Sequence, residues 1–175
     1  RKAVIEPFVE EYLSARTPNP CVECNAAVKF GTMLDYALEI GCDGIATGHY
    51  AKIEEKNGRF LLRRSESAKD QSYFLFRLTQ HQLSKAIFPL EGMDKEEIRL
   101  KAEKAGLPVA RKSDSQEICF VPDDDYIAYL SSLGISSPKG KFIDINGNVL
   151  GEHSGIINYT IGQRKGLGAF GKPMF

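Results

Sequence analysis

The sequence predicts an α/β protein made of two parts. An amphipathic pattern runs through residues 25–40, Gly41 ends it, and the short apolar run GIATGH at residues 44–49 follows. A helix, a glycine turn and a short apolar strand in this order are typical of a parallel sheet. After Gly134, hairpin signals and glycines dominate instead. We therefore expect a parallel-sheet portion followed by a smaller α+β portion, with the change between residues 75 and 95.

The first portion contains further predicted elements. Residues 2–13 mix apolar and acidic side chains, so we expect the end of a strand and the start of a helix there. Pro18 and Pro20 argue against helix up to residue 20, because a proline restricts its own backbone and that of the residue before it. The segments on either side of Asn57–Gly58 predict a β-hairpin that turns at this pair.

Three helices are predicted downstream of this hairpin. The run that begins at Asp70 predicts a short helix. Asp94, with Glu97 three residues later, forms a capping-box pattern, so we expect a helix over residues 95–105. A further helix is expected over residues 126–133, directly after an acidic run.

The sequence after Gly134 predicts β-structure. Asn146–Gly147 lies between apolar residues and predicts a second hairpin. The segment GIINYTIG, residues 155–162, predicts another strand. Both elements belong to the smaller α+β portion.

The charge balance does not point to a particular class of partner. The chain has 23 Lys and Arg against 23 Asp and Glu, so its net charge gives no sign of nucleic acid. Residues 139–175 hold five basic and two acidic side chains. This local excess is compatible with a phosphate backbone nearby, and equally with an ordinary solvated surface.

Composition suggests the cellular setting. Hydrophobic residues make up 42% and charged residues 26%, as in folded soluble proteins. No apolar run approaches the roughly 20 residues of a membrane span. The chain begins at Arg1 without a signal-peptide pattern, and four cysteines are too few for a disulfide scaffold. We expect a fragment of a cytoplasmic protein.

Cys21 and Cys24 are the first candidates for chemistry. Cys24 lies near the predicted helix start, where unpaired N–H groups and the helix dipole favour a thiolate. A Cys-x-x-Cys pair alone leaves three readings open: half of a zinc site, a redox pair, or two ordinary small residues. Zinc needs further ligands, and the other candidates show no second metal-type spacing, so we predict no metal site. These candidates are Cys42, Cys119, His49, His81 and His153.

Three other segments are candidates. Gly48 follows a predicted parallel strand, where ligands gather and where a glycine lets the backbone approach a nucleotide closely. The run KDQS, residues 69–72, gathers a cation, an anion and an amide, but also fits a helix cap with a neighbouring lysine. Cys119 lies among apolar residues, so a buried core cysteine is an alternative to a reactive one. We interpret Cys42 as structural.

Taken in order, the motifs are more specific than any one of them. TPNPCVECN…KFG, ATGHYAKI, KDQSYFL, SQEICFVPDDDY and HSGIINYTIGQRKGLG together resemble the tRNA-specific 2-thiouridylases, ATP-pyrophosphatase-type enzymes that put sulfur on the wobble uridine of tRNA. The resemblance covers nearly the whole chain. The family's opening phosphate loop and its closing β-barrel domain have no counterpart in this sequence.

The resemblance implies a domain division. Residues 1–85 correspond to the C-terminal half of an adenine-nucleotide-binding catalytic domain, and the loop of residues 113–125 returns to it. Residues 86–175 correspond to a smaller central α+β domain. On this reading the chain is an internal piece of the family's enzyme.

The resemblance also implies roles. Cys119 matches the carrier of a persulfide, and Cys24 the partner thiol that attacks it and ends in a disulfide with Cys119. ATP, with Mg²⁺, activates the uridine, and a sulfur-relay protein or cysteine desulfurase delivers the sulfur. Gly48 matches an ATP contact. The residues that match contacts to the target base or to other parts of the tRNA are Asn19, Pro20, Cys21, His49, Lys69, Asp70 and Gln71.

Cys21 departs from part of the family, and this leaves alternatives open. Some members carry an Asp there that is proposed as a general acid or base, and a thiol is a poorer base at neutral pH. With Cys24 and Cys119 it offers three thiolates to an iron–sulfur cluster, as in some tRNA sulfurases. Two further readings are an inactive module that binds tRNA and partners, and a zinc-stabilised binding domain.

Overall fold

The structure is a computed structural model that describes residues 1–112, 118–163 and 165–168. The chain divides into two compact units, one made of Arg1–Pro20 with Gln116–Phe175 and the other of Cys21–Ser115. The domain boundary predicted between residues 85 and 86 falls inside the second unit, so the two compact units do not coincide with the two predicted domains. The division into catalytic and central domains stays a prediction.

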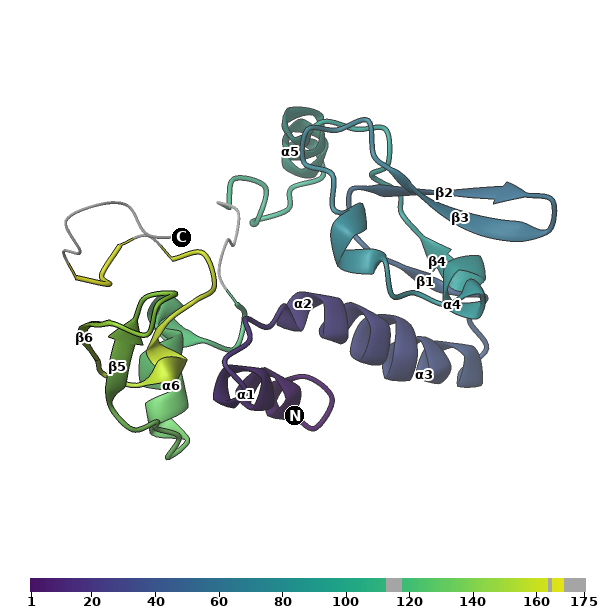
Figure 1. The fold of residues 1–175 in the computed structure, drawn as a ribbon. Helices are drawn as coiled ribbons and strands as arrows, with labels where there is room; N and C mark the ends of the chain where they lie inside the picture. Colours follow the sequence, from purple (N-terminus) through teal and green to yellow (C-terminus); the bar gives the residue numbers. More distant parts are fainter. Residues whose placement is uncertain (113–117, 164, 169–175) are drawn as a thin grey trace. The chain divides into compact units, whose positions relative to one another are not determined.

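One helical stretch dominates the second unit. It runs through α2 (Pro20–Glu23), η1 (Cys24–Thr32) and α3 (Met33–Glu39) and appears as a single long rod in Figure 1. The helix predicted from residue 25 is confirmed, but it begins earlier, at Pro20. A proline suits a first helical position because the missing N–H has no helical acceptor there.

The middle segment of this rod, η1, is a π-helix, and it starts at Cys24. Gly31 breaks its regularity with φ −99° and ψ −106°. A side chain at Gly31 would press on the carbonyl oxygen of Ala26, with its Cβ 3.1 Å away. The wide turns leave backbone groups available to side chains from outside the helix.

The predicted parallel pairing is present. β1 (Ile45–Ala46) pairs in parallel with β4 (Ala86–Ile87). Gly44, just before β1, has no room for a side chain, because a Cβ would collide with the carbonyl of Lys85. This close approach brings the two strands into register, and the segment that follows β1 emerges at their carboxyl ends.

The predicted first hairpin is confirmed. β2 (Ala51–Lys56) and β3 (Arg59–Arg64) are antiparallel, with Lys56 opposite Arg59. Asn57 and Gly58 both have positive φ, 52° and 72°, as a two-residue hairpin turn requires.

Short helices complete the second unit. Asp70 is followed by η2 (Ser72–Leu75), a 3₁₀ turn at the predicted short helix, and then by α4 (Gln80–Lys85). The capping box at Asp94 begins α5 (Lys95–Lys104), as predicted. The hydrophobic core of this unit consists of Phe30, Ala51, Leu75, Leu78, Leu83 and Phe88.

The first unit is built around α1 (Ile5–Leu13) and α6 (Tyr126–Ser132). Asp125 caps α6 by accepting a hydrogen bond from the N–H of Ala128, and the helix predicted over residues 126–133 is confirmed. The strand end predicted within residues 2–13 is wrong, because residues 2–4 form a turn. The core of this unit consists of Phe8, Tyr12, Val121, Leu130 and Ile157.

The end of the first unit differs in part from the prediction. The second hairpin is present as β5 (Gly140–Ile143) and β6 (Val149–His153). The strand predicted over residues 155–162 is wrong, since η4 (Ile156–Asn158), a 3₁₀ turn, lies there. Gly155 has φ +135°, and the N–H of Ile157 donates to the Ser137 hydroxyl at 3.3 Å, so local contacts replace a strand ladder.

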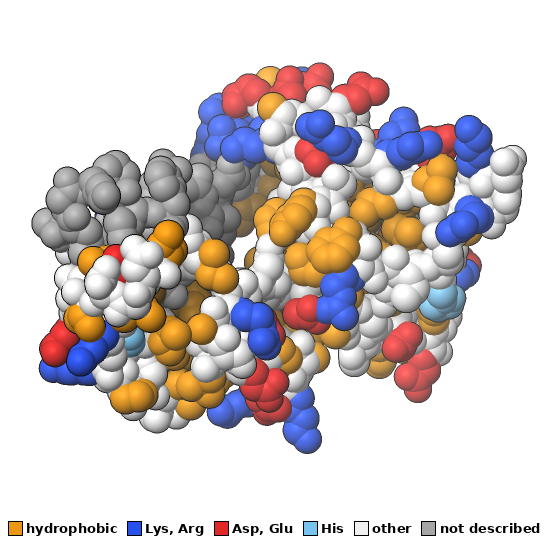
Figure 2. All heavy atoms as spheres, viewed as in Figure 1, with side chains coloured by type: hydrophobic (Ala, Val, Ile, Leu, Met, Phe, Trp, Pro, Cys, Tyr) orange, Lys and Arg blue, Asp and Glu red, His pale blue; other side chains and the backbone are white. Residues whose placement is uncertain are grey.

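The surface reflects the composition. Figure 2 shows acidic and basic side chains interspersed over the visible face, in keeping with their equal numbers in the sequence. None of the helices among the described residues is both long and apolar enough to cross a membrane.

Candidate functional site

A pocket of about 510 Å³ lies where β1 ends, within the second unit. This is the edge at which ligands bind in open parallel sheets, and the size suits a small molecule. Three predicted site residues, Gly48, His49 and Gln71, come together here. The full lining consists of Lys29, Met33, Ile45, Ala46, Thr47, Gly48, His49 and Gln71.

The lining fits an adenine nucleotide. Ile45 and Met33 offer apolar surface of the kind that a base ring packs against, and Lys29 adds an ammonium group suited to a phosphate. Gly48 is exposed, and a Cβ there would make only an ordinary contact, 3.7 Å from Leu90 Cδ1. The protein leaves space beside this backbone, as a close ligand contact requires.

His49 is buried in this pocket wall, with 9% of its surface exposed. Its Nδ1 lies 2.8 Å from the Thr47 hydroxyl, and its ring contacts the rings of Phe30 and Phe88. Burial, with a smaller effect of the Lys29 charge, lowers the pKa of His49 to about 4. The imidazole is therefore neutral at pH 7, and its predicted contact with tRNA would be a hydrogen bond rather than a charge pair.

Asp70 organises the loop before η2. Its carboxylate accepts hydrogen bonds from the N–H of Ser65 at 2.8 Å and from the hydroxyl of Ser72 at 2.8 Å. Burial alone raises the pKa of Asp70, but these hydrogen bonds and the Arg64 charge outweigh it and lower that pKa. The neighbouring Lys69 is exposed.

Gln71 joins this loop to the pocket. Its Oε1 accepts a hydrogen bond from the N–H of Tyr50 at 3.1 Å, and its own N–H donates to the Tyr50 carbonyl at 2.7 Å. The segment predicted to contact tRNA is thereby fixed to the residues that follow Gly48 and His49.

Cys24 is half-buried and is held by the same framework. Asn25, the next residue, donates from Nδ2 to the carbonyl of Phe74 in η2 at 3.0 Å. Cys24 was expected near the start of a helix from residue 25, but the helix begins earlier, at Pro20. The unpaired N–H groups therefore belong to the turn before Cys24. Cys21 lies in that first turn and is exposed.

Sequence reasoning missed two residues that hold this helix. Asn25 was interpreted only as the start of an amphipathic pattern, yet it is 2% exposed. Gln82 donates from Nε2 to the carbonyl of Ala26 at 2.9 Å while its Oε1 accepts from the N–H of Thr79. A polar residue at the first buried position of an amphipathic helix was the available signal for Asn25.

Cys119 lies in the first unit, at the corner of a tight turn closed by the N–H of Val121 and the carbonyl of Ile118. Ile118 and Phe120 pack against the core and Val121 is 5% exposed, whereas Cys119 itself is exposed. The alternative of a buried core cysteine is therefore wrong.

The turn is anchored by aromatic rings. The Phe120 ring lies edge-on to the ring of Phe8 in α1, with centroids 5.2 Å apart, and 5.6 Å from the ring of Tyr129 in α6. Residues 113–117, the first part of the predicted returning loop, lie outside the described residues. Cys24 and Cys119 belong to different units, so their approach stays a prediction.

The predicted base-contacting residues lie where one unit passes into the other along the chain. Asn19 is half-buried and Pro20 is buried at the end of the first unit's opening segment, and Cys21 opens the second unit. Cys42 is exposed. Within the described residues, no cysteine is in a disulfide, and no three His, Cys, Asp or Glu side chains are grouped as a metal site.

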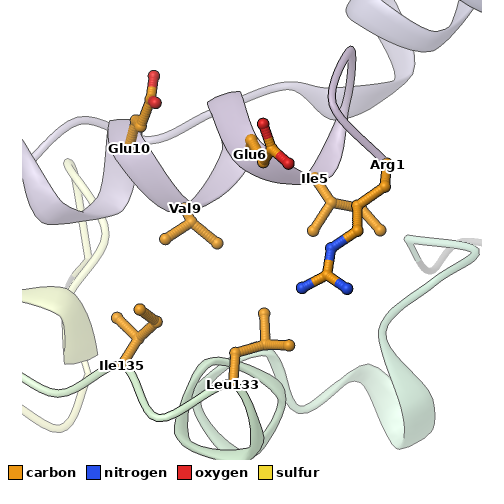
Figure 3. Close-up of a pocket in the computed structure, with 7 residues that line it drawn as sticks. All are labelled: Arg1, Ile5, Glu6, Val9, Glu10, Leu133 and Ile135. Carbon is orange, nitrogen blue, oxygen red and sulfur yellow. The ribbon is translucent and has the colours of Figure 1, made fainter.

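A second cavity, of about 220 Å³, lies in the first unit (Figure 3). Residues of α1 and of the segment after α6 surround it, and apolar side chains form much of its wall. No predicted site residue lines it, so it is not the candidate site. Its lining consists of Arg1, Ile5, Glu6, Val9, Glu10, Leu133 and Ile135.

Comparison with known proteins shows the family to which the chain belongs. The model of the tRNA methyl transferase HUP domain matches residues 1–123, and that of the tRNA methyl transferase PRC-barrel domain matches residues 128–175. Similar curated proteins are named tRNA-specific 2-thiouridylase MnmA. The chain belongs to the tRNA-specific 2-thiouridylase family. Its fold is accordingly a HUP-type α/β domain followed by a small barrel-like domain, which agrees with the predicted fold class.

The similarity to individual thiouridylases is high. The chain is 57% identical to the protein from Treponema denticola, over 98% of this chain and 49% of that protein. It is 53% identical to a protein from Clostridium tetani, over 100% of this chain and 50% of that protein. For a protein from Caldanaerobacter subterraneus the identity is 56%, over 94% and 46%. The chain therefore spans about half the length of these relatives.

Proposed function

We propose that this chain forms part of an ATP-dependent enzyme that replaces the 2-oxygen of the wobble uridine of tRNA with sulfur. The observation that carries the proposal is the pocket beyond β1, which is lined by Gly48, His49 and Gln71. Gln71 belongs to the segment that leads into η2, and Asn25, next to Cys24, donates a hydrogen bond to the carbonyl of Phe74 in η2. The family models are described as methyl transferase domains, whereas the relatives are named for thiolation. An exposed thiol at Cys119 and a half-buried one at Cys24 favour thiolation.

The pocket would hold the adenine nucleotide. A uridine carbonyl oxygen is a poor leaving group, and ATP, with Mg²⁺, supplies AMP as a better one. Ile45 and Met33 would pack against the base, the Gly48 backbone would approach the nucleotide closely, and Lys29 would face its phosphates. These residues position the nucleotide at the carboxyl end of the parallel strands.

Sulfur would pass between two cysteines. Cys119 receives sulfur as a persulfide from a sulfur-relay protein or a cysteine desulfurase. The Cys24 thiolate attacks the sulfur bonded to the Cys119 side chain, forms a disulfide with it, and releases the terminal sulfur as hydrosulfide. Hydrosulfide adds to C2 of the activated uridine, and AMP leaves. A thiol reductant then returns the disulfide to two thiols with two electrons.

Two groups of residues would hold the tRNA. Asn19, Pro20 and Cys21 would touch the target base, which must leave its stack to reach a thiol. His49, Lys69, Asp70 and Gln71 would contact other parts of the tRNA. Because tRNA is the proposed substrate, we propose a cytoplasmic location.

A cysteine comparison in the full-length protein tests this function. Thiolation of tRNA is measured for Cys24→Ser, Cys119→Ser and the matched control Cys42→Ser, an exposed cysteine outside the proposed site. We expect the first two variants to lose thiolation and the control to keep it. Retained thiolation in Cys24→Ser or Cys119→Ser would overturn the assigned roles.

Anaerobic iron and sulfide analysis of the same proteins separates the persulfide mechanism from the iron–sulfur alternative. Persulfide chemistry predicts no stoichiometric iron. Iron bound to the parent protein and lost on Cys21→Ser would favour a cluster instead. ATP–pyrophosphate exchange on the 175-residue chain alone tests whether it is only a tRNA- and partner-binding module. We expect no exchange in the isolated chain and exchange in the full-length protein.

A further inference from the structure

Among the described residues of the second unit, Asn25 is the most deeply buried polar one, and the proposed chemistry does not use it. It is 2% exposed and directly follows Cys24. Its Nδ2 donates to the carbonyl of Phe74 at 3.0 Å, and its Oδ1 has no hydrogen-bond partner among the described residues. A buried amide with an unpaired acceptor opposes folding, so stability alone does not explain why this position is polar.

The hydrogen bond of Asn25 crosses between two functional segments. Phe74 lies in η2, three residues after Gln71, and Gln71 is bonded on both its backbone and its side chain to Tyr50 beside the pocket. Asn25 therefore connects the first turn of η1, where Cys24 lies, to the segment proposed to contact tRNA.

The helix itself leaves this first turn in need of an external support. η1 is π-helical from Cys24, and such wide turns are rare and less regular than α-helix. Two side-chain hydrogen bonds anchor this turn. Asn25, which belongs to the turn, donates to the carbonyl of Phe74, and Gln82 of α4 donates to the carbonyl of Ala26 in the turn. Of these, the Asn25 bond lies next to the thiol and reaches the proposed tRNA segment.

We propose that Asn25 is a positioning residue, which fixes Cys24 relative to the Lys69–Gln71 segment so that the thiol is correctly placed when tRNA is bound. The inference rests on the proposed function and deepens it. A displacement of about 1 Å at a reacting group costs up to about a hundredfold in rate, so loss of this one bond lowers turnover without weakening tRNA binding.

Two substitutions of similar size test the role in the full-length enzyme. Asn25→Leu fills the same space but cannot donate to Phe74. Asn25→Asp cannot donate while it is ionised, but burial raises the pKa of such a carboxyl, and the protonated acid can donate from its O–H. At pH 7.5 we expect kcat for thiolation to fall about tenfold or more in Asn25→Leu, with KM for tRNA unchanged within about twofold.

The pH profile separates positioning from loss of fold. We expect the ratio of kcat in Asn25→Asp to kcat in Asn25→Leu to rise as the pH is lowered from about 8.5 to about 6, because only the acid regains its donor. Parallel profiles for the two variants would overturn the positioning role. So would a wild-type kcat in Asn25→Leu.

Leu83→Ala is the matched control for destabilisation, because Leu83 is 6% exposed in the core of the same unit and lies outside the site. At a temperature where circular dichroism shows all variants folded, we expect Leu83→Ala to keep the wild-type kcat. A loss in Leu83→Ala equal to that in Asn25→Leu would contradict the inference. If Cys24→Ser retains thiolation, both the proposed function and the role of Asn25 are contradicted. If Cys24→Ser loses thiolation but Asn25→Leu keeps the wild-type kcat, only the role of Asn25 is contradicted.

Discussion

Gln71 and Tyr50 hold each other by two reciprocal hydrogen bonds, from the Tyr50 N–H to Gln71 Oε1 at 3.1 Å and from the Gln71 N–H to the Tyr50 carbonyl at 2.7 Å. One of these bonds belongs to the side chain and can be removed by mutation. The pair joins the loop before η2 to the segment that leaves β1, and so determines the shape of the proposed nucleotide pocket.

Gln71→Ala should loosen this pocket. We expect KM for ATP in the full-length enzyme to rise about fivefold, since loss of a side-chain bond worth about 1 kcal/mol frees the wall on which the nucleotide rests. Gln80→Ala is the control, because the Gln80 side chain also accepts a hydrogen bond from a backbone N–H, that of Phe60, and donates to the carbonyl of the same residue, away from the pocket. Equal effects on KM in both variants would show that Gln71 has no special link to ATP.

His49 should remain neutral throughout the physiological range. Its pKa is lowered to about 4, so the unfolded chain binds a proton more readily than the folded one. The stability due to neutral His49 is complete above about pH 6.5 and is lost as the pH falls from there to about 4. We expect a loss of at most about 3 kcal/mol in urea unfolding over this window.

Replacement of His49 provides the control for that pH dependence. His49→Gln removes the titrating ring, and its unfolding free energy should vary less between pH 6.5 and 4 than that of the parent protein. A direct NMR titration of the His49 ring that gave a midpoint near 6.5 would contradict the burial described for this residue.

Asp70 should act in its ionised form. Burial opposes the charge, but hydrogen bonds from Ser65 and Ser72 and the Arg64 charge lower its pKa below the ordinary value. The stability that it contributes is therefore present above about pH 4 and is lost as the pH falls through the lowered pKa. We expect Asp70→Asn to cost about 1 kcal/mol in chemical unfolding at pH 7, after allowance for partial solvent screening, and the difference to shrink below pH 4. A cost that is independent of pH would show that the charge is not responsible.

Phe120 should hold the turn of Cys119 on the first unit. Phe120→Ala removes the ring contacts with Phe8 and Tyr129, and we expect a loss of about 2 kcal/mol in stability because the ring is only half-buried. Limited proteolysis should then cut faster near Cys119. Ile157→Ala, in the same core but on η4, is the control, and an equal change in cleavage would show general loosening instead.

Local signals in the sequence predicted much of the fold. The positive-φ pair Asn57–Gly58 and the capping box at Asp94 act over a few residues, so their elements followed directly from the pattern. The start at Pro20 was missed because a proline both stops a preceding helix and begins a new one. Residues 155–162 resembled a strand because apolar composition does not reveal a hydroxyl such as Ser137 that binds the backbone from elsewhere.

The candidate site was predictable only where residue type decides the chemistry. Cysteines and the glycine after a short strand stand out in a sequence, and Gly48 does line the pocket. The bonds of Asn25 to Phe74 and of Gln71 to Tyr50 span 49 and 21 residues, and no local pattern encodes them. The pairing of Cys24 with Cys119 stays a prediction, because the two residues belong to different units.

The turn at Cys119 separates anchoring from reactivity: Ile118, Phe120 and Val121 take part in the hydrophobic core, and the thiol between them does not. Chemical labels, spin probes or selenocysteine can therefore be introduced at position 119 without disturbing the architecture of the first unit. An exposed thiol at a position fixed by its neighbours is a convenient place to trap a sulfur donor.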